Sequence, residues 1–192
     1  VETKYGRNEE RLAEFFLERF EDWGYNSSGY GPLPTMEKRI PYVATIWTEG
    51  PRSFSAGEKS RYTDIFAPAV QKRLRKRVRE ATAGHVENRY CLGYVFIDLP
   101  VWHPQPRRGE SYCDFVRSLD ASAPGRKAYE DFVAQCQAEG KAADDEGFLN
   151  RIANVYYTCV AGELRKADPN HLVLGDRLMA LPDWTPDSIL VT

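Results

Sequence analysis

The chain lacks the features that would place it in a membrane or on a nucleic acid. No run of apolar residues approaches the roughly 18 that a membrane span needs. The first seven residues lack the apolar core of a signal peptide. Neither sign of charge predominates, because 26 basic and 28 acidic side chains leave a net charge of −2. Near-neutral charge gives no electrostatic reason to expect a nucleic-acid or membrane partner.

Metal-binding and cofactor-binding signatures are absent from the sequence as well. The four cysteines form no C-x-x-C pair and the three histidines are scattered, so no metal site is expected. Buried free thiols are the simpler interpretation of the cysteines. The run Gly29-Tyr30-Gly31 has neither a third glycine nor a following helix, so the sequence predicts no nucleotide cofactor.

What the chain does have is the composition of an ordinary soluble globular protein. Hydrophobic residues make up 42% and charged residues 28% of its 192 residues. That length suits one domain with a hydrophobic core. We therefore expect a single domain over residues 1–192.

Hydrophobic periodicity predicts alternating helices and strands. The clearest strand is an apolar run at 90–98 that ends in Asp98, and near-continuous apolar strands are typical of parallel sheets. Helices are expected at 8–23, 65–82, 126–138 and 146–166, and strands at 25–28, 41–47, 90–98 and 171–176, with a further strand beginning at 189–191. The alternation predicts an α/β fold in which the four complete strands are parallel neighbours and the helices at 8–23, 65–82 and 146–166 lie outside the sheet.

One predicted helix concentrates positive charge. The polar face of the helix at 65–82 holds six basic side chains between positions 72 and 79. Such a cluster could contact phosphates, but interleaved aromatic residues and a glycine-rich phosphate loop are absent. A solvated outer helix face is therefore the favoured interpretation.

Polar and aromatic side chains stand where the predicted strands end. Asn26 lies in the first strand, Trp47 closes the second, Asp98 ends the third, and Asp176 and Arg177 end the fourth. Parallel strands bring their carboxyl ends to one edge, where (β/α)₈ barrels carry their active sites. We therefore expect Asp98, Asp176, Trp47 and Arg177 to share a cleft. A full barrel takes about 250 residues, so the element order predicts a partial barrel, about strands 2–6.

Three motifs resemble those of one group of enzymes. Residues 20–27 are similar to the helix followed by (W/L)-G-(F/Y)-N-(T/S) that begins the second barrel strand in clan-A-like glycoside hydrolases. Residues 88–98 resemble the fourth-strand motif N-P-Y-x-L-G-Y-F-x-D-N-E of the β-agarases and their relatives. Residues 164–177 resemble the approach to the fifth strand, (I/L)-R-x-x-D-P-N-H-L-x-L-G-x-R. The matches stand in the family's order and frame the chain from about residue 8 to 192.

The resemblance implies a (β/α)₈ barrel that hydrolyses glycosidic bonds in polysaccharide. That chemistry needs two carboxylates flanking the bond. In the family, the acid/base is the glutamate of the N-E pair and the nucleophile sits near the seventh strand. Aligned without gaps, Asp98 stands at the family's asparagine and Leu99 at its glutamate, and the chain offers no seventh strand.

Two interpretations of Asp98 stay open. In the first, Asp98 is the general acid, shifted along the chain from the family's glutamate, and the apolar surroundings of the buried strand would raise its pKa. In the second, Asp98 is a cap or an ion-paired group at the strand end, with Arg177 as a partner. Asp176 has the same two interpretations. Arg177 either binds sugar hydroxyls, a carboxylate or a sulfate, or neutralises the edge.

Aromatic side chains indicate where a sugar would bind. Trp47, Trp102 and Trp184 follow predicted strands, where an indole face can stack on a sugar ring or pack within a loop. His103 beside Trp102 is either a base or a loop hydrogen-bonding group. Together with Asn26 and Arg177, these residues form the expected substrate-binding set.

Three functions compete on this sequence. The first is an agarase-like or galactanase-like hydrolase, and the second is a carbohydrate-binding pseudo-enzyme that keeps the cleft without the glutamate. The third is a truncated fragment whose uncovered strand edges self-associate. The 192-residue chain alone is expected to hydrolyse weakly or not at all. The resemblance implies a polysaccharide or oligosaccharide partner and a soluble, secreted or periplasmic protein.

Overall fold

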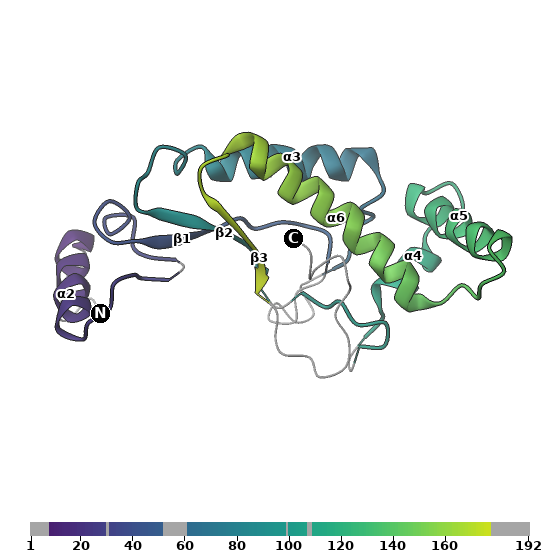
Figure 1. The fold of residues 1–192 in the computed structure, drawn as a ribbon, viewed down its shortest axis with the longest axis horizontal. Helices are drawn as coiled ribbons and strands as arrows, with labels where there is room; N and C mark the ends of the chain where they lie inside the picture. Colours follow the sequence, from purple (N-terminus) through teal and green to yellow (C-terminus); the bar gives the residue numbers. More distant parts are fainter. Residues whose placement is uncertain (1–7, 30, 52–60, 99, 107–108, 178–192) are drawn as a thin grey trace.

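The fold is built on three parallel strands. The computed structural model describes residues 8–29, 31–51, 61–98, 100–106 and 109–177. Strands β1 (Tyr42–Thr45), β2 (Cys91–Asp98) and β3 (Leu172–Arg177) lie in the order β1-β2-β3 (Figure 1). In register, Ala44 stands beside Tyr94 and Tyr94 beside Val173. The prediction that these three strands are parallel neighbours is confirmed.

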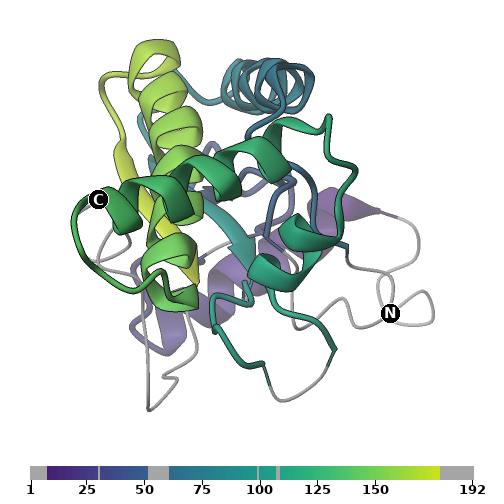
Figure 2. The ribbon, with the colours of Figure 1, turned by 90° about the vertical axis from the view of Figure 1, so that its right-hand side faces the viewer.

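Two long helices cover one face of the sheet. Helices α3 (Pro68–Thr82) and α6 (Asp145–Ala167) lie side by side there (Figures 1 and 2). Leu74 of α3, Tyr94 and Phe96 of β2, and Ile152 of α6 are buried in one core cluster. The helices predicted at 65–82 and 146–166 are therefore confirmed as an outer layer. Within the described ranges, no helix is both long and apolar enough to cross a membrane.

Helix α3 begins three residues later than predicted. The carboxylate of Asp64 accepts a hydrogen bond from the Phe66 backbone amide at 3.0 Å and so caps a turn, not the helix. The helix itself begins at Pro68, whose fixed φ and missing N–H suit the first helical turn. The same Asp64 carboxylate accepts from the Gly125 amide at 2.9 Å, which ties this turn to the start of α5 (Pro124–Ala138).

Helix α2 does not join the outer layer. It spans Glu9–Asp22 and stands beyond β1, at the opposite end of the molecule from α4 (Tyr112–Ser118) and α5 (Figure 1). Its Ala13 is buried with Met36 and Ile40 in a second, smaller cluster. The prediction that this helix covers the sheet is wrong, because its apolar residues pack on the segment at 33–40 instead. Trp23, the C-terminal cap of α2, is 62% exposed.

The strand predicted at 25–28 is also wrong. The segment runs along β1, with hydrogen bonds from the Ser28 amide to Pro41 O at 2.9 Å and from the Val43 amide to Gly29 O at 2.6 Å. These bonds form no regular ladder, because Gly29 takes a φ of 67° and interrupts the extended backbone. The strand expected at 189–191 lies outside the described residues.

A buried carboxylate fixes the start of β3. Asp168 is 1% exposed and accepts a hydrogen bond from the Tyr94 hydroxyl at 2.5 Å. Its carboxylate also lies 2.7 Å from His171 Nδ1 and accepts from the backbone amides of Asn170 and His171. Burial opposes ionisation, but these hydrogen bonds outweigh it and hold the pKa of Asp168 below its usual range. The ionised carboxylate therefore links β2 to the turn before β3.

We predict that Asp168→Asn lowers the free energy of unfolding by about 1–3 kcal/mol at pH 7, since it weakens a buried, charge-assisted network. The folded-state pKa of Asp168 is depressed. The difference from wild type is therefore full above the pKa of an unfolded aspartate, about 4, and shrinks as the pH falls through the folded-state value. Urea unfolding across this pH range measures it. The exposed Asp131→Asn is the control, and equal losses for both variants contradict the prediction.

Candidate active site

The carboxyl ends of the three strands meet at one edge of the sheet. Trp47 follows β1, Asp98 ends β2, and Asp176 and Arg177 end β3. Asp98 and Arg177 are paired in the β2–β3 register, so their backbones are neighbours. Four of the residues expected to share a site thus lie along one edge, the edge where parallel α/β folds bind ligands.

The chain after β1 combines an open indole with two fixed polar groups. The Trp47 side chain is 63% exposed. Next to it, the Thr48 hydroxyl is buried and lies 2.6 Å from the Tyr156 hydroxyl of α6. Glu49 forms an ion pair with Arg73 of α3, with Oε1 and Nε 3.0 Å apart. The segment is therefore fastened to both helices, while its tryptophan stays open to a ligand.

Asp176 is held from the helix side of the sheet. The Tyr157 hydroxyl of α6 donates a hydrogen bond to its Oδ2. The Trp102 indole N–H lies 3.5 Å from the same oxygen and donates to the Tyr157 hydroxyl at 3.1 Å. Burial and the nearby Asp176 carboxylate raise the pKa of Tyr157, which keeps its hydroxyl protonated as a donor. This contact joins the end of β3 to the helix layer.

Trp102 belongs to a buried aromatic cluster. Its side chain is 1% exposed, with ring centroids 5.8 Å from Tyr156, 5.8 Å from Tyr157 and 5.9 Å from Tyr112. Its ring is therefore enclosed by other aromatic rings in the core. Gly50 adjoins the cluster with a φ of 137°, and a Cβ there would meet the Tyr156 ring at 3.0 Å. A side chain at position 50 would displace this support.

The remaining expected residues take different positions. His103 is half-buried, and its Nδ1 accepts a hydrogen bond from the Gln105 amide at 2.9 Å, so it shapes the loop after β2. Asn26 is exposed and lies before β1, away from the carboxyl edge. Trp184 lies outside the described residues.

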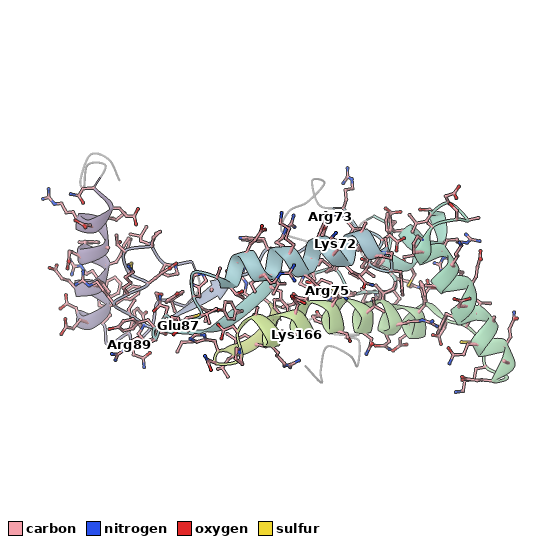
Figure 3. All side chains as sticks on the ribbon, turned by 90° about the horizontal axis from the view of Figure 1, so that it is seen from above. Lys72, Arg73, Arg75, Glu87, Arg89 and Lys166 are labelled. Carbon is pink, nitrogen blue, oxygen red and sulfur yellow. The ribbon has the colours of Figure 1, made fainter. Side chains whose placement is uncertain are left out.

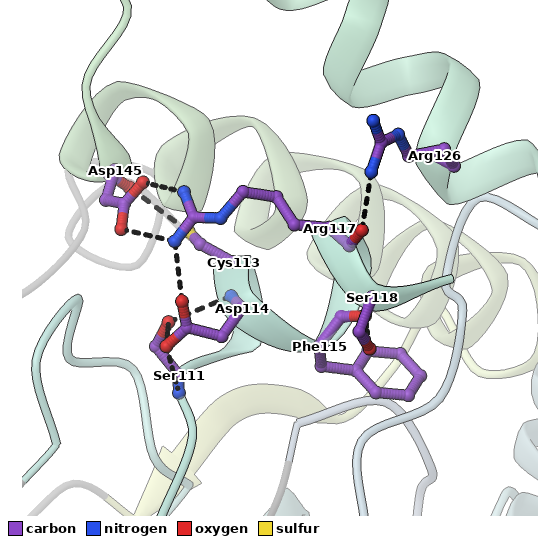
Figure 4. Close-up of polar contacts among 8 residues, drawn as sticks. All are labelled: Ser111, Cys113, Asp114, Phe115, Arg117, Ser118, Arg126 and Asp145. Carbon is purple, nitrogen blue, oxygen red and sulfur yellow. Dashed lines mark hydrogen bonds and ion pairs between the residues drawn. The ribbon is translucent and has the colours of Figure 1, made fainter. Parts of the chain in front are cut away.

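A polar network fixes α4, which the chain enters after the loop that follows β2. Ser111 caps this helix, accepting from the Asp114 amide at 3.0 Å while its own hydroxyl donates to the Asp114 carboxylate at 2.8 Å. Arg117 then bridges Asp114, at 2.7 Å, to Asp145 at the start of α6 (Figure 4). The Arg117 and Ser111 contacts hold the pKa of Asp114 below its usual range. The network anchors the far end of the segment that carries Trp102 and His103.

The sequence reasoning missed the groups that organise this edge. Tyr156 and Tyr157 follow each other in α6, and the sequence reasoning gave neither of them a role at this edge. Their hydroxyls instead fasten Thr48 and Asp176. The serine followed three residues later by an aspartate, Ser111 and Asp114, is a capping signal that could have revealed α4. In the described part of the chain, no group of three or more histidine, cysteine or acidic residues could hold a metal ion.

Comparison with known proteins supports the fold of an agarase. No protein-family model matches the sequence, and no curated protein matches it. Among solved structures, one described as an exo-β-agarase aligns with a TM-score of 0.72 at 22% identity, covering 98% of this chain and 32% of its own. PfGH50B aligns with a TM-score of 0.73 at 21% identity, covering 98% and 33%. The agarase AgWH50C aligns with a TM-score of 0.65 at 24% identity, covering 92% and 29%.

The chain therefore shares the fold of part of these enzymes and spans about a third of their length. The agarase resemblance drawn from the three motifs is confirmed at the level of the fold. The described elements form a mixed α/β structure with a three-stranded parallel sheet, as expected for that resemblance.

We predict that Tyr157→Phe destabilises the chain by about 1–3 kcal/mol, because Asp176 loses a buried hydroxyl donor. The ring of Tyr157 stays in place, so packing with Trp102 is kept. Tyr25→Phe, at a side chain that is 60% exposed, is the matched control and should change stability by less than about 0.5 kcal/mol. Urea unfolding of the two variants measures the difference, and coincident midpoints contradict the anchoring role of Tyr157.

Proposed function

We propose that the chain is part of a (β/α)₈ barrel, about strands 2–6, that acts on a galactan-like polysaccharide. The observation that carries the proposal is the shared edge of three parallel strands, with Trp47, Asp98 and Arg177 along it, in a fold similar to solved agarases. An exposed indole beside charged groups suits a sugar, which offers an apolar ring face and a rim of hydroxyls.

Within this proposal, Asp98 is the general acid. It would protonate the glycosidic oxygen as the bond to the anomeric carbon breaks, while a second carboxylate supports that carbon from the opposite face. Arg177 is the backbone neighbour of Asp98 and would bind a sugar hydroxyl or an anionic substituent. Trp47 would stack on the ring.

Asp176, the other carboxylate of this edge, is contacted from the helix side. The hydrogen bond from Tyr157 and the approach of Trp102 favour a role in anchoring β3 over direct contact with substrate. Trp102 shares that role because its ring is buried and packs against tyrosine rings. Asp98 is therefore the stronger candidate for chemistry.

A carbohydrate-binding pseudo-enzyme is the second candidate, and one residue favours it. Leu99 stands where the agarase motif has its glutamate, and leucine cannot transfer a proton. A chain with this substitution would keep the aromatic and charged edge while losing the main acid/base group. The two candidates share the ligand and differ in whether the bond breaks.

We predict weak hydrolysis by the 192-residue chain, lowered a further 10²- to 10⁴-fold by Asp98→Asn, with oligosaccharide binding retained. Reducing-sugar release from a panel of galactans and calorimetric binding of agarose oligosaccharides test the two steps separately. Asp131→Asn on α5 is the control for a lost surface charge. Wild-type binding without sugar release supports the pseudo-enzyme, and the absence of both overturns the proposal.

We further propose that the chain self-associates through its uncovered edge. Among the described residues β3 is an outer strand of the sheet, and its Leu172 and Leu174 are 62% and 46% exposed. Open edges and exposed apolar faces seek partners. Light scattering coupled to size-exclusion chromatography should report dimers or larger species, and Leu172→Lys with Leu174→Lys should shift them toward monomer. A wild-type monomer at all concentrations contradicts this.

A further inference from the structure

Helix α3 presents a stripe of positive charge on the outside of the helix layer. Lys72, Arg75, Lys76 and Arg79 follow the spacing i, i+3, i+4, i+7, which places them on one helix face. Arg75 is half-buried and the other three are exposed. Figure 3 looks onto this layer and shows Lys72 and Arg75 on α3, with Lys166 on the neighbouring α6. We call the four residues the α3 basic stripe.

The stripe weakens the helix that carries it. Lys72 and Lys76, and Arg75 and Arg79, are like charges one turn apart, an arrangement that destabilises a helix. Glu80, 3.5 Å from Lys76, is the one acidic residue in α3. Glutamates at alternate turns would have stabilised the same exposed face. Departures from a local rule of this kind are expected at functional surfaces.

Neighbouring carboxylates neutralise only part of this charge. Glu163 of α6 pairs with Arg79. In the described part of the chain, neither Lys72 nor Arg75 has an ion pair with a carboxylate, and Arg75 donates only to the Gln71 side chain at 3.3 Å. The helix holds six basic residues and one acidic residue, and Glu49 and Glu163 from neighbouring segments pair with Arg73 and Arg79, so the face stays net positive in a chain whose net charge is −2. A cluster of basic side chains that carboxylates neutralise only in part attracts an anionic ligand.

The shape of the surface narrows the class of ligand. Helix α3 is packed side by side with α6, so only its outer face, which carries the stripe, is open to a ligand. It contains no aromatic residue on which unpaired bases could stack. Its apolar residues Val70, Leu74 and Val78 are buried, so it has no apolar face to insert into a membrane. A polymer with regularly spaced anionic groups can lie along the stripe without any of these features.

We propose that the α3 basic stripe binds a sulfated or carboxylated polysaccharide. The choice of a polysaccharide rests on the proposed function, whereas the anionic requirement rests on the stripe itself. Arginine and lysine donate charge-assisted hydrogen bonds to sulfate and carboxylate oxygens. The stripe belongs to the helix layer and is separate from the carboxyl edge of the sheet. It would hold charged segments of a polymer whose neutral segments occupy that edge.

The test compares two triple variants that lose equal charge. In the stripe variant, Lys72, Arg75 and Lys76 become glutamine, and Arg79 is left to its pair with Glu163. In the control, Arg11, Lys38 and Lys127, which are exposed on other parts of the molecule, become glutamine. Calorimetry of each 192-residue chain uses carrageenan oligosaccharide as the sulfated galactan, agarose oligosaccharide as the neutral one, and a short DNA duplex. Circular dichroism verifies that each variant is folded.

The stripe variant should bind the sulfated galactan on the order of tenfold more weakly than wild type, and wild-type binding should weaken steeply with added salt. The control variant and the neutral galactan should show no such loss. No wild-type binding to the sulfated galactan, equal losses in both variants, or tighter binding to DNA overturns the proposal. If the chain still binds the neutral galactan when one of these outcomes is found, the stripe proposal fails while the proposed function stands. The failure of one proposal can therefore be distinguished from the failure of the other.

Discussion

The structure depends on the parallel pairing of β2 with a strand on each side. Parallel neighbours cannot be joined by a tight turn, so the chain must cross over the sheet between them. Helix α3 makes the crossover from β1 to β2, and α6 makes the one from β2 to β3, after the chain has passed through α4 and α5. Both long helices bury one face of the sheet. The same pairing brings the three carboxyl ends to one edge, where the candidate site lies.

Two aspartates fasten opposite ends of β3, and each does so through a tyrosine hydroxyl. Asp168, before the strand, accepts from Tyr94 of β2. Asp176, near its end, accepts from Tyr157 of α6. The buried carboxylate of Asp168 is stable only because donors replace the water it has lost, and the half-buried Asp176 is likewise held by its donor. The short outer strand is thereby held to the central strand and to the helix layer.

The structural role of Asp176 affects which residues of the carboxyl edge would contact a sugar. Asp176 is engaged in holding the scaffold, whereas Trp47 remains open and Asp98 stands beside Arg177 in the register. The replacement of the motif's glutamate by Leu99 makes binding easier to explain than bond cleavage. The α3 basic stripe would add a second contact suited to anionic groups. Both proposals describe a protein that holds polysaccharide on two surfaces.

Local patterns in the sequence determined the elements whose signal is strong. The apolar run of β2, the one-faced pattern of α6 and the capping Asn8 of α2 fix their own structure over a few turns, so the strands and long helices could be predicted. The parallel order followed from the alternation of those elements. The segment at 25–28 had strand-like residues but lacked a regular ladder, which depends on a neighbour and on the φ of Gly29.

Tertiary structure alone decided what each site residue contacts. Trp102 and Trp47 both follow strands, yet one is enclosed by tyrosines and the other is open. Asp176 turned out to be an anchor because Tyr157 reaches it from a helix nineteen residues earlier. Helix α2 packs on the segment at 33–40, where its apolar residues share a cluster with Leu33, Met36 and Ile40. Sequence periodicity shows which face of an element is apolar, but the partner of that face is fixed only when distant segments pack together.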